Sequence, residues 1–127
     1  MEENCRFTLE HIGIKAKDMD ESIAFYSQVL GFELIKRIKP GEVELAFMRL
    51  GNTVVELVEL NKSMPNQDGL VNHLALKTDD IFSATEHLKR FRVHLLSPEP
   101  CSMGEGRYNL FFRGPSGEKL ELFQGSF

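Results

Sequence analysis

Hydrophobic and polar residues alternate along several short segments of this chain, a pattern typical of strands that are buried on one face. The segment 8–16 is the first of them. His11 and Lys15 lie on one face of the predicted strand, and Ile12 and Ile14 lie on the other. The aliphatic face needs cover from another element, so we expect a helix to lie against it.

Four further elements complete the first half of the chain. Apolar residues three and four positions apart predict a helix that begins near Met19 and ends before Gly31, a typical C-terminal stop residue. Three β-type runs follow, joined by a Pro-Gly turn and a Gly-Asn turn, and they predict a three-stranded meander. These runs cover residues 33–39, 43–50 and 53–59.

The same pattern starts again after residues 61–69, NKSMPNQDG, a stretch of turn formers that we interpret as a linker. A strand over 70–77 and a helix that begins at the Asp79-Asp80 cap are expected. Strands are then predicted at 93–97, 108–113 and 119–123, with a long connection at 98–107. We therefore predict an α+β fold in which two βαβββ modules, about 8–60 and 70–124, form one domain spanning 1–127.

A histidine opens each half of the chain, and a glutamate closes it. His11 precedes Glu56 by 45 positions, and His73 precedes Glu121 by 48. The residues after the two histidines align without a gap, HIGIKAKDM at 11–19 and HLALKTDDI at 73–81. The alternation places all four side chains on the faces opposite the aliphatic residues. Two imidazoles and two carboxylates suit a divalent metal ion, so these four residues are candidate ligands.

Each of these residues has an ordinary interpretation when it is taken alone. A histidine on a half-buried strand can satisfy its ring with a backbone carbonyl, and Glu56 can be an exposed residue of an alternating strand. However, a carboxylate between Val55 and Leu57, and another between Leu120 and Leu122, is costly to bury without a partner. One shared cation removes that cost at all four positions, so the duplicated pattern favours a metal site.

Composition and charge exclude several other classes of function. The chain has 127 residues and a net charge of −4, with scattered basic residues, so nucleic-acid binding is not expected. No apolar run approaches the roughly 18 residues of a membrane span. The acidic opening MEENCRF does not resemble a signal peptide, which predicts a cytoplasmic protein. Cys5 and Cys101 form no CxxC pattern and are interpreted as reduced thiols.

Four segments resemble the vicinal oxygen chelate superfamily, which includes glyoxalase I, methylmalonyl-CoA epimerase, antibiotic resistance proteins and extradiol dioxygenases. They are HIGIKAKDMDESIAFYSQVLGFEL at 11–34, LGNTVVELVE at 50–59, NHLALKTDD at 72–80 and GPSGEKLELFQ at 114–124. The resemblance covers essentially the whole chain. It implies that the two modules curl into a half-open, mostly antiparallel barrel around one metal.

Within the superfamily, the ligand set most resembles that of bacterial glyoxalase I, or lactoylglutathione lyase. The resemblance implies that His11, Glu56, His73 and Glu121 bind one divalent ion; it favours Ni²⁺ or Zn²⁺, and the ligand chemistry also admits Co²⁺, Mn²⁺ and Fe²⁺. It implies a lyase or isomerase that converts a 2-oxoaldehyde thiohemiacetal to a 2-hydroxyacyl thioester. Glu121 or Glu56 would transfer a proton through a metal-bound enediolate, and we favour Glu121 as the base.

Two other functions remain open, the first on the same ligand pattern and the second on the same fold. An enzyme that resembles methylmalonyl-CoA epimerase would use the two carboxylates on opposite faces of a thioester enolate. A non-catalytic, ligand-binding protein of the resistance type is the second alternative. Short bacterial glyoxalases place a glutathione-binding asparagine shortly after the fourth-strand glutamate; here Leu60 occupies that place and Asn61 is one residue beyond, which leaves the thiol open.

Basic residues near the predicted site are candidates for substrate binding. Lys15 and Lys77 each follow a histidine by four residues, and with Arg107 they are placed to attract an anionic thiol adduct or thioester. Their alternative interpretation is as ordinary lysines and an arginine at the rim. The connection 98–107 contains two glycines and is either a closing loop or a simple link. A half-open barrel leaves sheet edges exposed, and members of the superfamily commonly cover them by dimerising. The resemblance therefore implies a homodimer.

Overall fold

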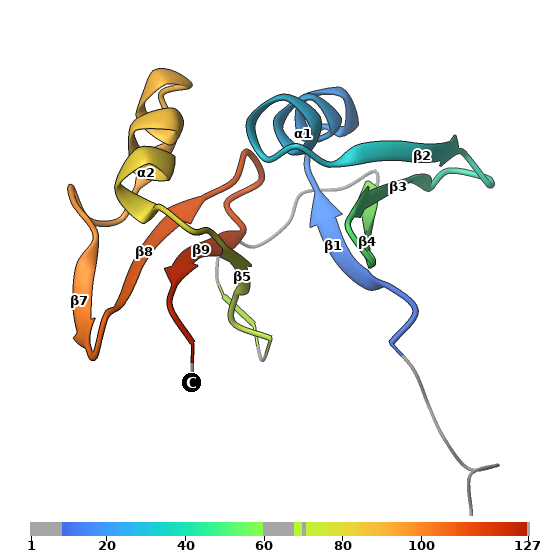
Figure 1. Cartoon of the computed structure of the whole chain (residues 1–127). Helices are drawn as coiled ribbons and strands as arrows, with labels where there is room; N and C mark the ends of the chain where they lie inside the picture. Colours follow the sequence, from blue (N-terminus) through green and yellow to red (C-terminus); the bar gives the residue numbers. More distant parts are fainter. Residues whose placement is uncertain (1–8, 60–67, 70, 127) are drawn as a thin grey trace, which may run out of the picture. The chain divides into compact units, whose positions relative to one another are not determined.

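A computed structural model describes residues 9–59, 68–69 and 71–126 of the chain (Figure 1). The chain divides into two compact units, Met1–Asn61 and Lys62–Phe127, which are described separately. Each unit contains one sheet, with its own helical segment beside it. Among the helices in these described ranges, none combines the length and the apolar character needed to cross a membrane.

The first unit contains a four-stranded sheet in the order β1-β4-β3-β2. Its strands are β1 (Ile12–Ala16), β2 (Glu33–Ile38), β3 (Glu44–Leu50) and β4 (Thr53–Glu59). β1 and β4 are parallel, and the other neighbours are antiparallel. The predicted meander is therefore present, and the first strand of the unit closes onto the last. The first strand begins at Ile12, later than predicted, because residues 9–11 lie outside the ladder and residue 8 lies outside the described residues.

The helix predicted over residues 19–30 consists of two parts. The α-helix α1 (Met19–Ala24) begins at Asp18, whose side chain accepts a hydrogen bond from the backbone amide of Glu21 at 2.9 Å. A π-helix, η2 (Phe25–Val29), then replaces the α-helical ladder. The hydroxyl of Ser27 donates to the carbonyl of Ile23, a local bond of the kind that bends helices.

The second unit repeats this plan with one additional strand. Its elements are β5 (Leu74–Lys77), α2 (Ile81–Arg90), β6 (His94–Leu95), β7 (Cys101–Gly104), β8 (Arg107–Arg113) and β9 (Lys119–Gln124). The sheet has the order β5-β9-β8-β6, and β7 also pairs with β8. β5 is parallel to β9, as β1 is to β4. The predicted strand at 70–77 is shorter than expected, since it begins at Leu74.

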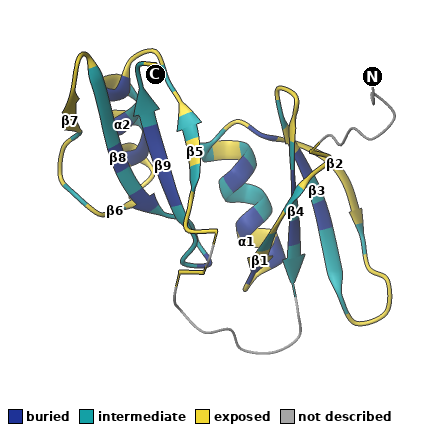
Figure 2. Cartoon of the chain, turned by 90° about the horizontal axis from the view of Figure 1, so that it is seen from below, coloured by how far each residue is buried: buried dark blue, intermediate teal, exposed yellow. Residues whose placement is uncertain are grey.

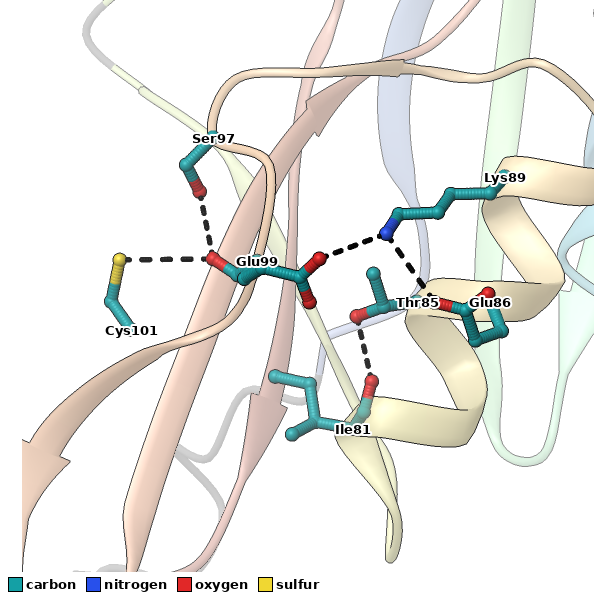
Figure 3. A network of polar contacts seen from close by, with 7 residues as sticks. All are labelled: Ile81, Thr85, Glu86, Lys89, Ser97, Glu99 and Cys101. Atoms are coloured by element: carbon teal, nitrogen blue, oxygen red, sulfur yellow. Dashed lines mark hydrogen bonds and ion pairs between the residues drawn. The ribbon is translucent and has the colours of Figure 1, made fainter.

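The connection predicted at 98–107 is not a simple loop, because it contains the strand β7. β6 pairs with the end of β8, and β7 pairs with its beginning, so together they form one interrupted edge. An ion pair joins the segment between β6 and β7 to α2, because Lys89 Nζ lies 3.0 Å from Glu99 Oε2 (Figure 3). The carbonyl of Glu99 also accepts a hydrogen bond from the Ser97 hydroxyl at 3.2 Å. The turn before β8 uses Glu105 with a φ of 55° between two glycines.

The core of each unit lies between the sheet and its helix. α1 packs on β3 and β4, and α2 packs on β8 and β9. Buried residues flank both glutamates along their strands: Val55 and Leu57 beside Glu56, and Leu120 and Leu122 beside Glu121. Figure 2 shows the central strands darker than the exposed edge strands β2 and β7. The helices therefore cover the aliphatic faces, as the alternation predicts, and the histidines and glutamates belong to the opposite faces.

Candidate metal centre

Each unit brings one histidine and one glutamate together. In the first unit, Nε2 of His11 lies 3.3 Å from Oε1 of Glu56. In the second unit, Nε2 of His73 lies 3.0 Å from Oε1 of Glu121. The same nitrogen and the equivalent oxygen meet in both units, so the duplication seen in the sequence extends to the atoms of the two pairs.

The parallel strand pairs produce this match. Gly13 is the register partner of Glu56, and Ala75 is the register partner of Glu121. Each histidine stands two residues before that small partner, so it is on the same face of the sheet as the glutamate. Side chains on alternate residues of a strand point the same way, and a slip of one residue would separate each pair.

A phenylalanine completes each pair from the neighbouring antiparallel strand. Phe47 is the register partner of Glu56, and Phe111 is the register partner of Glu121. Their rings meet the histidine rings edge to face, with centroids 6.1 Å apart for His11 and 5.1 Å apart for His73. The aromatic rings restrict the orientation of the imidazoles and place apolar surface beside them.

The other ring nitrogen of each histidine is bound by the preceding residue. Nδ1 of His11 contacts the carboxylate of Glu10, and Nδ1 of His73 lies 3.0 Å from Oδ1 of Asn72. An acceptor at Nδ1 selects the tautomer that carries its proton there, which leaves the Nε2 lone pair for a metal. The hydrogen bond to Glu10 is the main reason that the pKa of His11 lies above its usual value; burial opposes this, and the charges of Glu10 and Glu56 add to it.

The two glutamates differ in their surroundings. The Glu121 side chain is 10% exposed, and that of Glu56 is 18% exposed. Asn109 on β8 donates a hydrogen bond from Nδ2 to Oε2 of Glu121 at 3.0 Å. A carboxylate in such a setting is costly without partners. Oε2 of Glu121 accepts from Asn109, and Oε1 faces the Nε2 lone pair of His73, so a cation between these two atoms would bind both.

The spacing within each pair suits two ligands of one metal ion. Donors about 2.1 Å from an ion are about 3.0 Å apart at a right angle and about 3.4 Å apart at the tetrahedral angle. The observed separations, 3.0 and 3.3 Å, lie within that range. Imidazole nitrogen and carboxylate oxygen are also donors that bind Ni²⁺ and Zn²⁺. The two histidines and two glutamates therefore suit a divalent ion of this kind.

The structure assembles the four predicted ligands as two pairs. Among the residues that it describes, no three histidine, cysteine or carboxylate side chains gather as a possible metal site. The pairs His11–Glu56 and His73–Glu121 each supply two donors, one pair from each unit. The convergence of both pairs on one ion remains a prediction.

The three basic residues predicted to bind substrate lie on the glutamate-bearing faces. Lys15 is the register partner of Val58, two residues after Glu56, and Lys77 is the register partner of Phe123, two residues after Glu121. Arg107 alternates with Asn109 and Phe111 along β8. Its guanidinium lies 2.9 Å from Glu105 and 3.4 Å from the carbonyl of Ser126, so it is tied to its own hairpin and the chain after β9. Leu60 and Asn61, which were compared with the glutathione-binding asparagine of short bacterial glyoxalases, lie outside the described residues.

Sequence reasoning missed the residues that support the pairs. Glu10 and Asn72 could have been found, because each directly precedes a predicted ligand and carries an acceptor. Phe47 and Phe111 required the hairpin register, which decides which residue stands beside each glutamate. Asn109 required the same information, because nothing in the sequence marks it as a neighbour of Glu121.

Each unit resembles a βαβββ module and carries a His–Glu pair on the sheet face opposite its helix. This arrangement agrees with the family that the sequence matches. Residues 8–122 match the model of the Glyoxalase/Bleomycin resistance protein/Dioxygenase superfamily. The chain belongs to this superfamily. The resemblance stated from the sequence motifs is thereby confirmed, and so is the α+β fold class with two sheets of mixed strands.

Three relatives are similar to most of this chain, and two of them carry the name of an activity. An uncharacterized protein of Bacillus subtilis, YwbC, is 34% identical and covers 91% of this chain and 96% of its own length. A protein of Synechocystis named "Probable lactoylglutathione lyase" is 33% identical, with 93% of this chain and 95% of that protein covered. The mitochondrial methylmalonyl-CoA epimerase of Homo sapiens is 31% identical over 81% of this chain, which spans 64% of that enzyme.

Solved structures share the fold at lower identity. The glyoxalase family protein from Enterococcus faecalis has a TM-score of 0.80 and 23% identity, covering 91% of this chain and 96% of that one. The glyoxalase I of Leishmania major, described as trypanothione-dependent, has a TM-score of 0.79 and 21% identity, covering 94% of this chain and 87% of that one. At these identities the comparison establishes the fold, which is the glyoxalase fold.

Proposed function

We propose that this chain is a metal-dependent lyase of glyoxalase I type, which converts the thiohemiacetal of a 2-oxoaldehyde to a 2-hydroxyacyl thioester. The observation that carries the proposal is the repeated pair, in which Nε2 of a histidine faces Oε1 of a glutamate at 3.3 Å and 3.0 Å. The name of the Synechocystis relative, a probable lactoylglutathione lyase, points to the same reaction.

We propose that His11, Glu56, His73 and Glu121 together hold one divalent cation, Ni²⁺ or Zn²⁺. The supporting features are the separations within the pairs and the acceptors at Nδ1, which leave a lone pair on each Nε2. A cation held there would supply Lewis-acid stabilisation of the negative charge that develops on the substrate oxygens, an effect worth several kcal/mol.

The two glutamates have separate roles in this reaction. Isomerisation requires a base that removes a proton from the carbon bearing the former aldehyde oxygen and returns it to the neighbouring carbon through an enediolate. We assign Glu121 as this base. Its carboxylate is oriented by Asn109, and its side chain is 10% exposed against 18% for Glu56, which would be the second carboxylate of the site. Phe47 and Phe111 limit water near the reacting carbons.

Lys15 and Lys77 are the proposed contacts for the anionic part of the substrate. Both are exposed and stand on the glutamate-bearing faces of their sheets. An exposed ammonium attracts a carboxylate from solution, and this attraction weakens as salt screens it. Arg107 is a weaker candidate because Glu105 already pairs with it.

The direct test is a thiol and aldehyde assay on the metal-loaded protein. Methylglyoxal is mixed first with glutathione and then with other low-molecular-weight thiols, and thioester formation is followed by absorbance. We expect turnover with at least one thiol after loading with Ni²⁺ or Zn²⁺, and its loss in Glu121→Gln. Metal-loaded protein that forms no thioester with any thiol would contradict the proposed reaction.

A second candidate function is supported by the human methylmalonyl-CoA epimerase among the relatives. An epimerase would use the same two carboxylates on opposite faces of a thioester, one to remove the α-proton and the other to return it. Solvent deuterium exchange into a 2-methylmalonyl thioester distinguishes the two reactions. Exchange without thioester formation from methylglyoxal would favour the epimerase.

A further inference from the structure

The second unit holds its glutamate with a donor that comes from a side chain of the central strand β8. Nδ2 of Asn109 donates to Oε2 of Glu121 at 3.0 Å, and Oε1 of the same carboxylate lies 3.0 Å from Nε2 of His73. An ionised carboxylate only accepts hydrogen bonds, and the amide nitrogen only donates them, so the direction of this bond is fixed by chemistry. Rotation of the carboxylate about its last torsion would break one contact or the other.

The first unit lacks this donor at the equivalent position. Phe47 and Phe111 stand opposite the two glutamates in the antiparallel ladders, which makes them equivalent. Two residues before them on the same faces are Leu45 and Asn109. A leucine offers no hydrogen bond, so the Glu56 carboxylate has no counterpart of the Asn109 amide at this position. The Asn109 amide therefore distinguishes the His73–Glu121 pair from the otherwise equivalent His11–Glu56 pair.

We propose that Asn109 is a positioning residue for Glu121: by holding Oε2 it fixes the plane of the carboxylate, so that Oε1 faces Nε2 of His73 and the ion that the two atoms would share. This inference rests on the proposed metal site and deepens it. Because Glu121 is largely buried, its second oxygen needs a partner, and Asn109 is the partner that the fold provides. Glu56 is left with more freedom to reorient when substrate binds.

Residues that hydrogen-bond to a metal ligand, without binding the metal themselves, affect metal affinity and activity. Their substitution typically lowers metal affinity or activity by about 10-fold to 100-fold. Asn109→Leu removes the donor, has a similar size, and reproduces the residue that the first unit carries. Leu45→Asn is the matched control, because it places an amide at the equivalent position beside Glu56.

The experiment measures Co²⁺ binding and the visible absorption of the bound Co²⁺ in wild-type protein, Asn109→Leu and Leu45→Asn. We expect Asn109→Leu to weaken Co²⁺ binding about 10-fold and to shift the absorption bands, since the geometry of one ligand changes. Leu45→Asn should not weaken binding. The thermal midpoint of the metal-free proteins is measured in parallel, and Asn109→Val serves as a second donor-free variant if the leucine variant does not fold.

A double-mutant cycle with Glu121→Ala separates positioning from a general structural role. If Asn109 acts through Glu121, Asn109→Leu has no further effect on Co²⁺ affinity once Glu121 is alanine, whereas it keeps its full effect beside Glu56→Ala. An equal effect in both backgrounds would overturn the proposal, as would wild-type affinity and spectrum in Asn109→Leu. These readouts need no substrate, so a failure of the glyoxalase assay leaves them interpretable.

If the thiol assay yields turnover, a kinetic readout adds to the cycle. Asn109→Leu should lower kcat about 10-fold or more with KM changed less than about twofold, because orientation of the base matters in the transition state and not in substrate binding. A rise in KM at unchanged kcat would contradict a positioning role.

Discussion

Two carboxylates of the same residue type have different environments in this chain, and that difference predicts different effects of substitution. Glu121→Gln keeps the size of the side chain but removes the proposed base, so we expect kcat to fall about 10²-fold to 10⁴-fold. Glu56→Gln should cost less in kcat, since an amide oxygen still binds a cation. Steady-state kinetics on metal-loaded proteins, with metal content measured for each variant, checks the comparison.

Equal losses in the two variants at equal metal content would show that the glutamates share the proton transfer, as an epimerase requires. The control is Glu59→Gln, which alters a carboxylate on the same strand that caps α1 by accepting from the Met19 amide at 2.8 Å. Because the glutamine oxygen can still accept from the Met19 amide, this variant should lower stability by less than about 1 kcal/mol, without a specific effect on kcat.

The residues of the candidate site were found from the sequence to different degrees. His11, Glu56, His73 and Glu121 could be predicted because duplication and alternation are properties of the sequence itself. The structure then shows that each His–Glu pair is formed within its own unit. Asn109 could not be predicted, because it meets Glu121 only through the offset of β8 against β9, which the sequence does not state.

At the scale of elements, an ion pair joins β8 to the segment that leads into β5. Nη1 of Arg113 lies 2.7 Å from Oδ1 of Asp68, and this hydrogen bond lowers the pKa of Asp68 from its usual 3.8. A lowered pKa means that the folded state favours the charged carboxylate. The pair therefore adds stability above the unfolded pKa, and that contribution disappears as the pH falls through the lower, folded-state pKa.

Asp68→Asn should therefore destabilise the protein at pH 7 and have little effect near pH 2. The wild-type protein should also lose more stability between pH 5 and pH 2 than the variant does. Urea unfolding midpoints across this range measure the difference, with Asp79→Asn as a control at an exposed position. A difference between wild type and Asp68→Asn that does not change with pH would show that the aspartate acts through packing and not through its charge.

Element boundaries show where sequence patterns stop being sufficient. The meander strands were predicted within a residue or two, because tight turns and alternation are local properties. The π-helical segment Phe25–Val29 was not predicted, since apolar spacing does not distinguish it from an α-helix. The strand β7 was also missed: its four residues are exposed and irregular, and they form a strand only because β8 lies beside them.

At the scale of the whole molecule, the edge strand of the first sheet predicts self-association. β2 is the last strand in its sheet order, and its Leu34 and Ile35 are 41% and 43% exposed. An unpaired edge that exposes apolar side chains offers its backbone groups for pairing with another chain. We expect a homodimer, with a mass in light scattering of about twice the 14.5 kDa of the chain. Leu34→Lys with Ile35→Lys should shift the protein toward monomer if this edge is the interface, and an unchanged mass would place the interface elsewhere.

The proposed four-ligand site predicts that tight metal binding requires the His–Glu pairs of both units. A double variant that lacks His11 and Glu56, and another that lacks His73 and Glu121, each retain only two donors, which is too few for tight binding. At a metal concentration 100 times the Kd, a ligand that binds only the folded state stabilises it by about 2.7 kcal/mol. We expect the wild-type thermal midpoint to rise on addition of Ni²⁺ or Zn²⁺, and neither double variant to respond.

Mixing the two double variants then distinguishes how the ligands are shared in a dimer. If each site combines the first unit of one chain with the second unit of its partner, a mixed dimer contains one complete site, because one chain supplies its intact His11–Glu56 pair and the other its intact His73–Glu121 pair. Co-refolded mixtures would then recover metal-dependent stabilisation and turnover. If each chain builds its own site, every site in the mixture lacks one pair, and no recovery occurs. Metal stabilisation of either double variant alone would show that two donors suffice, and would contradict the four-ligand site itself.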